Sequence, residues 1–430
     1  MSPETQAAIF FAVGMLSFMA LGMPMALALV LTGAGMSALL QFWDPQLLAQ
    51  NLVAGIDSFP LLAVPFFILA GELMNAGGIS QRIIDMAQVW VGHFRGGLGF
   101  VTIGAALLMA SMSGSALADT AALATILLPM MRAHGYPIAT SGGLIGAGGI
   151  IAPIIPPSMP FVIYGVTTNT SISLLFLSGI VPGLIMGAAL VVTWKLVLRG
   201  LDLPSGSASS WGERMRVSAR AFWALLMPVI IIGGMKTGVF TPTEAAVVAA
   251  FYALVIALGV HREMKLSAVY GVLLRAAKTT ALVMFLCAGA QVAAYMITLA
   301  DLPGVLSAFL GPLVDNPRLL MAVMMLTLIA VGTTLDLTPT ILILGPVLLP
   351  IATKAGIDPV YFGLMFILNG SIGLITPPVG TVLNVVAGVG KLPIHKVVQG
   401  VSPFLVAYVL ILALFVAFPQ IVIAPVAWMR

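Results

Sequence analysis

Two short polar segments carry the residues that could do chemistry in this chain. The first contains Ser113, Ser115 and Asp119, and the second contains Thr333-Thr334 and Asp336; both lie in strongly apolar surroundings. An aspartate inside a membrane-spanning segment costs about 2.5 to 3.5 kcal/mol on insertion scales, so it usually faces a cavity and serves a function. Hydroxyl and carboxylate oxygens suit a small hard cation such as sodium. The alternative for each aspartate is structural, as the cap of a helix N-terminus.

A proline-rich interruption follows each polar segment. Four prolines fall between Pro153 and Pro160, and Asn369 to Thr376 leads into Pro377-Pro378. A helix broken at membrane depth exposes peptide groups that only protein or a wet cavity can satisfy. Unwound carbonyls can bind a cation, and helix N-termini can present amides to an anion. Together, the segments and the interruptions predict joint transport of a cation and a carboxylate.

The candidate residues follow from these two patterns. The expected cation ligands are Ser113, Ser115, Asp119, Gly148, Pro153, Thr333, Thr334, Asp336, Asn369, Gly373 and Thr376. The expected substrate contacts are Ser113, Gly114, Ser115, Ser158, Thr333, Thr334 and Thr381. We expect Na⁺ as the coupling ion, and proton coupling through one of the two aspartates stays an alternative.

The two segments belong to a duplicated unit. Leu-Leu-Pro ends at Pro129 in the first copy and at Pro350 in the second, 221 positions later. The same shift superimposes Gly135 on Gly356, and it superimposes the proline pair that begins at Pro156 on the pair at 377 and 378. Helix breakers repeated in register inside apolar sequence are typical of binding sites made from interrupted membrane helices.

Composition places the chain in a membrane. Its 430 residues have a mean hydropathy of +1.14, are 60% hydrophobic and only 7% charged, and include one cysteine, Cys287. Soluble domains do not approach these values. The apolar runs are continuous and do not alternate, which favours helices over a β-barrel. No basic stripe, P-loop, disulfide framework or hydrolase motif occurs, so we expect neither nucleic-acid binding nor an enzyme.

We therefore predict an all-α polytopic membrane protein with inverted repeats, two re-entrant helical hairpins and two broken helices. Ten crossings are expected, with a loop from His261 to Lys278 before the second copy. The predicted divisions are scaffold spans at 1–58, a first repeat at 59–195 (hairpin 97–133, broken helix 137–167), a cytoplasmic linker with scaffold spans at 196–260, and a second repeat at 261–430 (hairpin 305–353, broken helix 359–389).

Basic residues set the expected orientation. Of the 18 lysines and arginines, all but Lys236, Arg318, Lys354 and Arg430 fall on one side of the predicted topology. Because basic loops stay in the cytoplasm, both termini should be periplasmic. The two hairpins then enter the membrane from opposite sides, an arrangement that lets one central site open alternately to either face.

Several longer motifs resemble those of a known family. They are the run from Pro65 to Gly71, the turn at 113–116 with Asp119, the break from Ile150 to Ser158, and the break from Asn369 to Gly380. These motifs are similar to the large membrane subunit of the tripartite ATP-independent periplasmic (TRAP) transporters, the DctM-like family. The similarity covers nearly the whole chain.

The resemblance implies an elevator-type secondary transporter of the ion-transporter superfamily, coupled to sodium, in the bacterial inner membrane. Its implied partners are a separate small four-helix membrane subunit (Q type), a periplasmic substrate-binding protein (P type) and the lipid bilayer. The cargo would be an organic acid, either a C4-dicarboxylate or a sialic or other sugar acid. Carried over by position, Ser113, Ser115 and Asp119 fall in the first hairpin site and Asp336 falls in the second.

Two other functions stay open from the residues alone. A stand-alone symporter or exchanger of the same superfamily would need neither partner. An intramembrane aspartyl protease would also use two membrane aspartates, but it requires a Gly-x-Gly-Asp context, whereas Ala118 and Leu335 precede the aspartates here.

Overall fold

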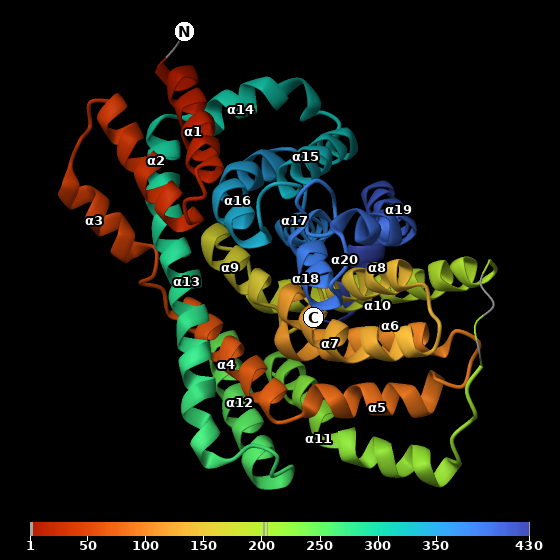
Figure 1. Cartoon of the computed structure of the whole chain (residues 1–430). Coiled ribbons are helices and arrows are strands. Elements are labelled where there is room, and N and C mark those ends of the chain that lie inside the picture. The colour runs from red at the N-terminus through yellow and green to blue at the C-terminus, as the bar shows by residue number, and fades with distance from the viewer. Residues whose placement is uncertain (1–2, 201–202, 204, 430) are drawn as a thin grey trace.

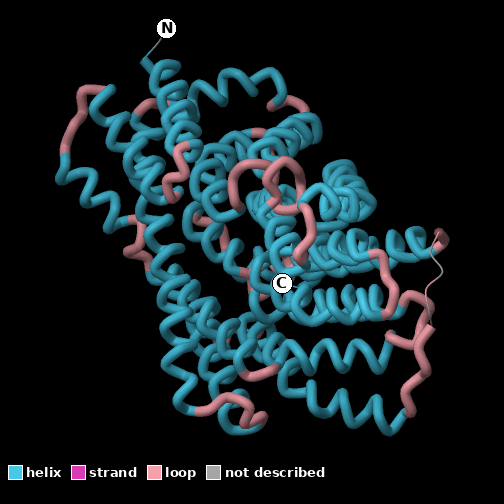
Figure 2. The backbone as a smooth tube through the Cα atoms, in the orientation of Figure 1, coloured by secondary structure: helices cyan, strands magenta, loops and turns pink. Residues whose placement is uncertain are grey.

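The computed structural model describes residues 3–200, 203 and 205–429, and the described residues form helices and loops without strands (Figures 1 and 2). Eight of the described helices are long and apolar enough to cross a membrane. The helices of the first half are α1 (Pro3–Ala20), α2 (Met25–Leu39), α3 (Pro45–Ala54), η1 (Phe59–Leu62), α4 (Ala63–Ala76), α5 (Ile79–Val91), α6 (Gly97–Ser113), α7 (Ala116–Ala133), α8 (Ile138–Gly149), α9 (Met159–Thr168) and α10 (Ile172–Leu198). Those of the second half are α11 (Trp211–Lys236), α12 (Pro242–Val255), η2 (Ile256–Val260), α13 (Leu266–Leu299), α14 (Leu302–Leu310), η3 (Gly311–Leu313), α15 (Pro317–Gly332), α16 (Leu337–Lys354), α17 (Pro359–Gly373), α18 (Thr381–Gly390), α19 (Ile394–Ala417) and α20 (Gln420–Met429).

Both predicted hairpins are present. The first hairpin is α6 and α7, and it turns at Gly114, whose φ of +61° is the left-handed conformation that glycine adopts most readily. The second hairpin is α15 and α16, and it turns at Thr333–Asp336. The turn residues explain the helix ends, because Ser115 and Asp336 lie at the N-cap positions of α7 and α16. Small polar residues are favoured at that position.

Both predicted broken helices are also present. The first break, residues 150–158, separates α8 from α9, and the second break, residues 374–380, separates α17 from α18. Proline has no amide hydrogen and its ring clashes with the preceding turn, so the proline clusters end both helices. The proline pair at 156–157 and the pair at 377–378 each contain a cis peptide bond.

The helices of the two copies also correspond at a constant separation of 221 positions. Moved by 221 positions, α7 at 116–133 coincides with α16 at 337–354. Gly135 and Gly356, which follow these helices, have φ values of +75° and +76°. The correspondence extends to the turns after α2 and α12, where Gln41 and Arg262 have φ values of +57° and +54°. The duplication is confirmed, and it includes helices near the start of the chain.

One pair of corresponding segments differs in shape. In the first copy, Gly55 and Pro60 fall between α3 and α4, which are two separate helices joined through η1. In the second copy, the corresponding residues are Ala276 and Ala281, and the single 34-residue helix α13 runs through them. Alanine favours a helix interior, whereas glycine and proline oppose it. The loop predicted from His261 to Lys278 was therefore wrong, because α13 begins at Leu266.

Helix α13 is the axis of a group of helices, α2, α3, α4, α12 and α13, that we call the scaffold. It runs down one side of the molecule in Figure 1 and contacts α2, α3 and α4 along its length, while α12 packs against α4. The predicted linker is shorter than expected, since α10 continues to Leu198 and α11 starts at Trp211. The division into domains stays a prediction.

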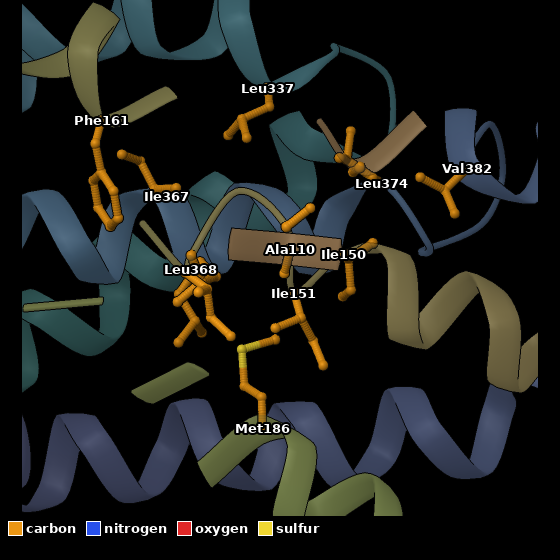
Figure 3. Packing of buried hydrophobic residues seen from close by; sticks show 14 of the residues in the cluster. Ala110, Ile150, Ile151, Phe161, Met186, Leu337, Ile367, Leu368, Leu374 and Val382 are labelled. Atoms are coloured by element: carbon orange, nitrogen blue, oxygen red, sulfur yellow. The ribbon is translucent and has the colours of Figure 1, made fainter. Parts of the chain in front are cut away.

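The two copies interlock around a common core. Helix α9 packs against α16 and α17, and α18 packs against α7 and α8. Figure 3 shows Ile150 and Ile151 of the first break in the same buried cluster as Leu374 of the second break and Val382 of α18. The Tyr408 hydroxyl of α19 donates a hydrogen bond to the Ala147 carbonyl of α8 at 2.7 Å. The breaks of both copies therefore lie in one protein interior.

Candidate functional site

The two hairpin tips meet at a small cavity of about 80 Å³. Gly114 and Ser115 of the first tip line it together with Pro153 of the first break. Asp336 of the second tip lines it as well, and Val283 of scaffold helix α13 forms part of the wall. Ordinary ligand pockets measure about 300 to 1,000 Å³. In this conformation the tips and the scaffold therefore enclose the meeting point too tightly for an organic acid.

The first tip rests directly on the first break. A Cβ atom at Gly114 would lie 2.7 Å from the Pro157 carbonyl oxygen and 2.9 Å from the Ser158 Cα. Ser158 is the residue before α9, is fully buried, and donates its hydroxyl to the Pro153 carbonyl at 2.6 Å. The predicted substrate contact Ser158 is thus used within the break, and it holds the unwound loop that faces the hairpin tip.

Asp119 lies just behind the first tip, in the first turns of α7. Only 2% of its surface is exposed, and its Oδ1 accepts a hydrogen bond from the Ser113 hydroxyl. The Ser113 oxygen in turn accepts from the Ser115 amide at 3.1 Å. Asp119 Oδ2 is buried and has no hydrogen-bond partner among the described residues. A buried carboxylate oxygen without a partner is costly, so this atom is a ligand candidate.

A second unsatisfied oxygen lies next to Asp119, and the sequence analysis missed it. Thr120 is fully buried, and its hydroxyl has no partner among the described residues. It points at Gly149, the last residue of α8, where any Cβ atom would collide with the hydroxyl oxygen. A hydroxyl beside an aspartate in an apolar segment was the available signal. The predicted ligand Gly148 is close by, on the same buried end of α8.

The second tip has a different arrangement. Asp336 lines the cavity, and its carboxylate lies beside the Leu337 amide at the start of α16. The Thr381 side chain lies beside its carboxylate. The two other predicted hydroxyls turn back to their own helix: Thr333 donates to the Ala330 carbonyl at 2.7 Å and Thr334 to that of Val331 at 3.0 Å. Neither threonine lines the cavity.

The remaining predicted ligands lie in the second half of α17 and in the second break. Asn369 of α17 is fully buried and donates its amide to the Met325 carbonyl of α15 at 2.6 Å. Its Oδ1 is buried without a partner among the described residues. A Cβ at Gly373 would lie 2.9 Å from the Cα of Gly332, so α15 and α17 touch through their backbones there. Thr376 donates to the Ile372 carbonyl at 2.8 Å within the same segment.

Unsatisfied buried oxygens thus gather at both breaks. They belong to Asp119 and Thr120 in the first copy and to Asn369 in the second, whereas the Thr381 hydroxyl faces the Asp336 carboxylate. Carboxylate, hydroxyl and amide oxygens are the donors that hard cations prefer, and native proteins rarely leave such atoms unpaired. The donor chemistry fits sodium. Within the described residues, no three His, Cys, Asp or Glu side chains come together as they would for a transition metal.

The two aspartates are not equivalent. With the shift of 221 positions, Asp336 corresponds to Ser115, and Asp119 corresponds to Thr340, which donates its hydroxyl to the Asp336 carbonyl at 2.8 Å. One carboxylate is therefore buried behind a tip, and the other lies at a tip facing the cavity. The structure brings Gly114, Ser115, Pro153 and Asp336 together at the cavity and leaves the other predicted residues around it.

Comparison with known proteins decides the family. Residues 12–421 match the family model described as the DctM component of the tripartite ATP-independent periplasmic transporters. The chain belongs to this family. Its DctM-component relatives are named large permease proteins, so it is a polytopic membrane protein of a bacterial transporter family.

Three relatives show the range of this DctM-component family. The chain is 53% identical to the 2,3-diketo-L-gulonate TRAP transporter large permease protein of Escherichia coli, covering 99% of this chain and 100% of that one. It is 42% identical to the sialic acid TRAP transporter large permease protein of Vibrio cholerae, covering 95% of each. It is 38% identical to the C4-dicarboxylate TRAP transporter large permease protein of Pseudomonas aeruginosa, covering 89% of this chain and 90% of that one.

A solved structure supports the fold. The crystal structure of the Alcanivorax borkumensis YdaH transporter, described as having an unusual topology, superimposes with a TM-score of 0.66 over 98% of this chain and 99% of that one. Only 15% of the residues are identical, so the likeness concerns the fold of this DctM-component protein alone.

Proposed function

We propose that this chain is the large membrane subunit of a sodium-coupled transporter that takes an organic acid into the cell. The observation that carries the proposal is the arrangement at the hairpin tips. The tips of the two hairpins meet at a small cavity, and unsatisfied buried oxygens occur in α7 of the first copy and in α17 of the second. The relatives named for diketogulonate, sialic acid and C4-dicarboxylates all carry acids, and this supports an organic acid as the cargo.

The residues suggest how cation and acid depend on each other. The N-terminus of α7, capped by Ser115, directs its amides toward the cavity and favours a carboxylate. Asp336 lines the same cavity and repels that carboxylate. A sodium ion held by nearby oxygens would offset this repulsion. The first-copy ligands would be Asp119 and Thr120, and the second-copy ligands would include Asn369 and Thr381.

The small cavity also supports a moving site. About 80 Å³ leaves room for two or three water molecules, so binding an acid requires the tips to separate from one another and from Val283 of α13. An elevator mechanism supplies such a motion, in which the hairpins and broken helices move past the scaffold as a body. The hairpins and broken helices of the two copies pack against each other beside α13, and this packing favours their movement as one unit relative to α13.

The proposed partners are a small four-helix membrane subunit and a periplasmic binding protein that delivers the acid. The proposed location is the bacterial inner membrane, with both termini in the periplasm, because the basic residues cluster on the other side. A stand-alone symporter would need neither partner, and the transport experiment below distinguishes the two.

The test is uptake into proteoliposomes that contain this chain and the small subunit, with the binding protein added outside. We expect uptake of the cognate acid only with all three components and an inward sodium gradient. Uptake that is unchanged when choline replaces sodium would refute the coupling. Uptake by this chain alone would identify a stand-alone symporter.

The moving site has a separate test. In a Cys287→Ala background, Ser115→Cys and Thr338→Cys place a thiol on each hairpin tip at the cavity. Both thiols should react with a membrane-impermeant reagent from the outside in one set of conditions and from the inside in another. Accessibility to one side only, with and without sodium and acid, would contradict an alternating site.

A further inference from the structure

A large polar cavity lies far from the hairpin tips, between α5, α11 and the loop that follows η2. Its volume is about 670 Å³. Three arginines line it: Arg82 of α5, and Arg216 and Arg220 of α11. His261 is also in the wall. Figure 1 shows α5 and α11 side by side at the edge of the molecule, and the two helices are in contact.

The positive charge of this cavity is only partly compensated. Arg82 pairs with Glu263 at 2.6 Å and donates to the Gly78 carbonyl at 3.0 Å. Asp85 accepts a hydrogen bond from Gln81 at 2.8 Å. Arg216 and Arg220 are one helical turn apart, both are exposed, and neither has a carboxylate partner among the described residues. Two unpaired guanidinium groups therefore face one open space.

His261 is a neutral part of the cavity wall. Burial and the neighbouring Arg82 charge lower the pKa of His261, so its ring is uncharged at neutral pH. The neutral ring adds no charge to the wall, and its two buried nitrogens lie beside the backbone of Gly77 and Arg220, so the guanidinium groups are the donors that face the cavity. An arginine guanidinium can donate two parallel hydrogen bonds to the oxygens of one phosphate group. Phosphate is therefore the anion that best matches the arginines of this cavity.

The depth of the cavity in the membrane points to the source of the phosphate. Along α11 the sequence changes from charged between Trp211 and Arg220 to apolar from Ala221 to Met235. Trp223, which lines the cavity, is 39% exposed. Tryptophan gathers at the level of lipid headgroups, and basic pockets on the cytoplasmic side bind anionic headgroups. The predicted topology puts these basic residues on the cytoplasmic side.

We propose that this cavity is a binding site for a phosphate group, held by Arg216 and Arg220, and supplied by an anionic phospholipid of the cytoplasmic leaflet. The site has a structural consequence. Helix α5 leads directly into the first hairpin, whereas α11 packs against α12 of the scaffold. A phosphate bound between them ties the helix that precedes the moving hairpin to the scaffold. The bound lipid therefore restrains the helix that leads into the first hairpin.

The test uses the full chain purified in a neutral detergent. Binding of dioleoyl-phosphatidylglycerol is compared with that of dioleoyl-phosphatidylcholine by thermal shift and by native mass spectrometry. We expect the anionic lipid to bind at least about tenfold more tightly, because its headgroup has no cationic choline to repel the arginines. A parallel titration with inorganic phosphate at constant ionic strength distinguishes a free anion from a lipid headgroup.

Matched variants locate the site. Arg216→Gln with Arg220→Gln should weaken phosphatidylglycerol binding by about 100-fold, since each charge-assisted contact is worth about tenfold. The control is Lys278→Gln with Lys396→Gln, which removes two exposed charges on the same predicted side away from the cavity and should change binding less than about threefold. The single change Arg216→Lys keeps the charge and should have an intermediate effect.

Several outcomes decide the proposal. Equal losses in the cavity double variant and the lysine control would overturn it, as would equal binding of the two lipids together with no response to phosphate. A response to inorganic phosphate that matches the lipid would support the site and assign it to the free anion. The thermal midpoint of each variant in phosphatidylcholine, expected to equal that of the original chain, excludes misfolding as the cause of a loss.

Discussion

The two copies share a backbone plan and differ in where the negative charge lies. In the first copy, Ser115 caps α7 at the cavity and Asp119 is buried behind it, bonded to Ser113. In the second copy, the carboxylate of Asp336 is itself at the tip, and Thr340 occupies the position that corresponds to Asp119. Duplication therefore preserved the geometry of the hairpins, while substitution left a serine hydroxyl at one tip and a carboxylate at the other.

The scaffold parts of the two copies differ in a second way. Helices α3 and α4 are separated in the first copy, and the end of α3 packs so closely on α13 that a Cβ at Gly55 would lie 2.7 Å from the Gln291 Cβ. The second copy has the continuous α13 instead. One copy thus supplies a long rigid axis, and the other supplies short helices that pack along it.

The largest expected effect comes from the two aspartates. Asp119→Asn should lower sodium-driven uptake by at least about 100-fold, because losing one partner of a buried charged site costs about 3 to 5 kcal/mol. Asp336→Asn should reduce uptake less, because Asp336 lines the cavity and its charge also repels the acid. Initial uptake rates against sodium concentration measure both. Equal losses would mean that the copies contribute alike to the ion site.

The glycines that end α8 and occupy the matching position in α17 provide the next test. In Gly149→Ala the new methyl group collides with the Thr120 hydroxyl, whereas in Gly370→Ala it meets the flexible end of Leu337. Overpacking costs about 1 to 3 kcal/mol, so the first variant should lower thermal stability clearly and the second only slightly. Thr120→Ala combined with Gly149→Ala should restore much of the stability. No recovery would place the strain elsewhere.

The hydroxyls before each tip should differ in importance. Ser113→Ala removes the donor to Asp119, a charge-assisted bond worth about 1.5 to 3 kcal/mol, and should raise the half-saturating sodium concentration about tenfold or more. The matching Thr334→Ala removes only a bond to its own helix and should change that concentration less than about threefold. Sodium titrations of uptake in both variants provide the comparison, and a larger effect at Thr334 would contradict it.

The smallest effect is expected at the turns before α3 and α13. His261 and Glu263 correspond to Leu40 and Phe42, so only the second copy has titratable groups at these two positions. Burial lowers the pKa of His261, and the hydrogen bond from Arg82 lowers the pKa of Glu263. Each group is therefore protonated more readily in the unfolded chain, and stability falls as the pH falls.

The contribution of His261 to folding stability is complete above its ordinary pKa of 6.5. It declines as the pH falls below that value toward the lower pKa of the folded state. The contribution of Glu263 to folding stability is lost only as the pH falls below 4.5. The thermal midpoint should drop by about 1 to 2 °C between pH 7.5 and 5.5 through His261, and His261→Gln should remove that part of the drop. An unchanged slope in His261→Gln would assign the dependence to another group.

The sequence was enough to predict the helices, hairpins and breaks, because proline and glycine act locally. The proline clusters near Pro153 and Pro377 end their helices wherever the chain goes, and the repeat of Pro129, Gly135 and Pro156 exposed the duplication. The same local reasoning failed between His261 and Lys278, where charged residues suggested a loop although the alanine-rich sequence continues as α13. Charge indicates exposure to water, and an exposed segment can still be helical.

The candidate site was only partly predictable. Asp119, Asp336 and Asn369 stood out as polar residues in apolar sequence, but Thr120 became a candidate only when its hydroxyl was found buried without a partner. Thr333 and Thr334 looked equivalent to the serines of the first tip, yet their hydroxyls bond to their own helix. Whether a hydroxyl is available to a ligand depends on its nearest carbonyl, which is a matter of side-chain geometry.

The sequence by itself determined that the chain is a helical membrane protein with two copies of a unit made of a hairpin and a broken helix. Hydropathy and helix breakers are properties of short segments, so they can be read without the fold. Only the tertiary structure decided which atoms meet: that Gly114 rests on the first break, that Asp336 shares a cavity with Ser115, and that Arg216 and Arg220 face α5. These contacts join residues distant in the chain, and close packing, not local preference, sets them.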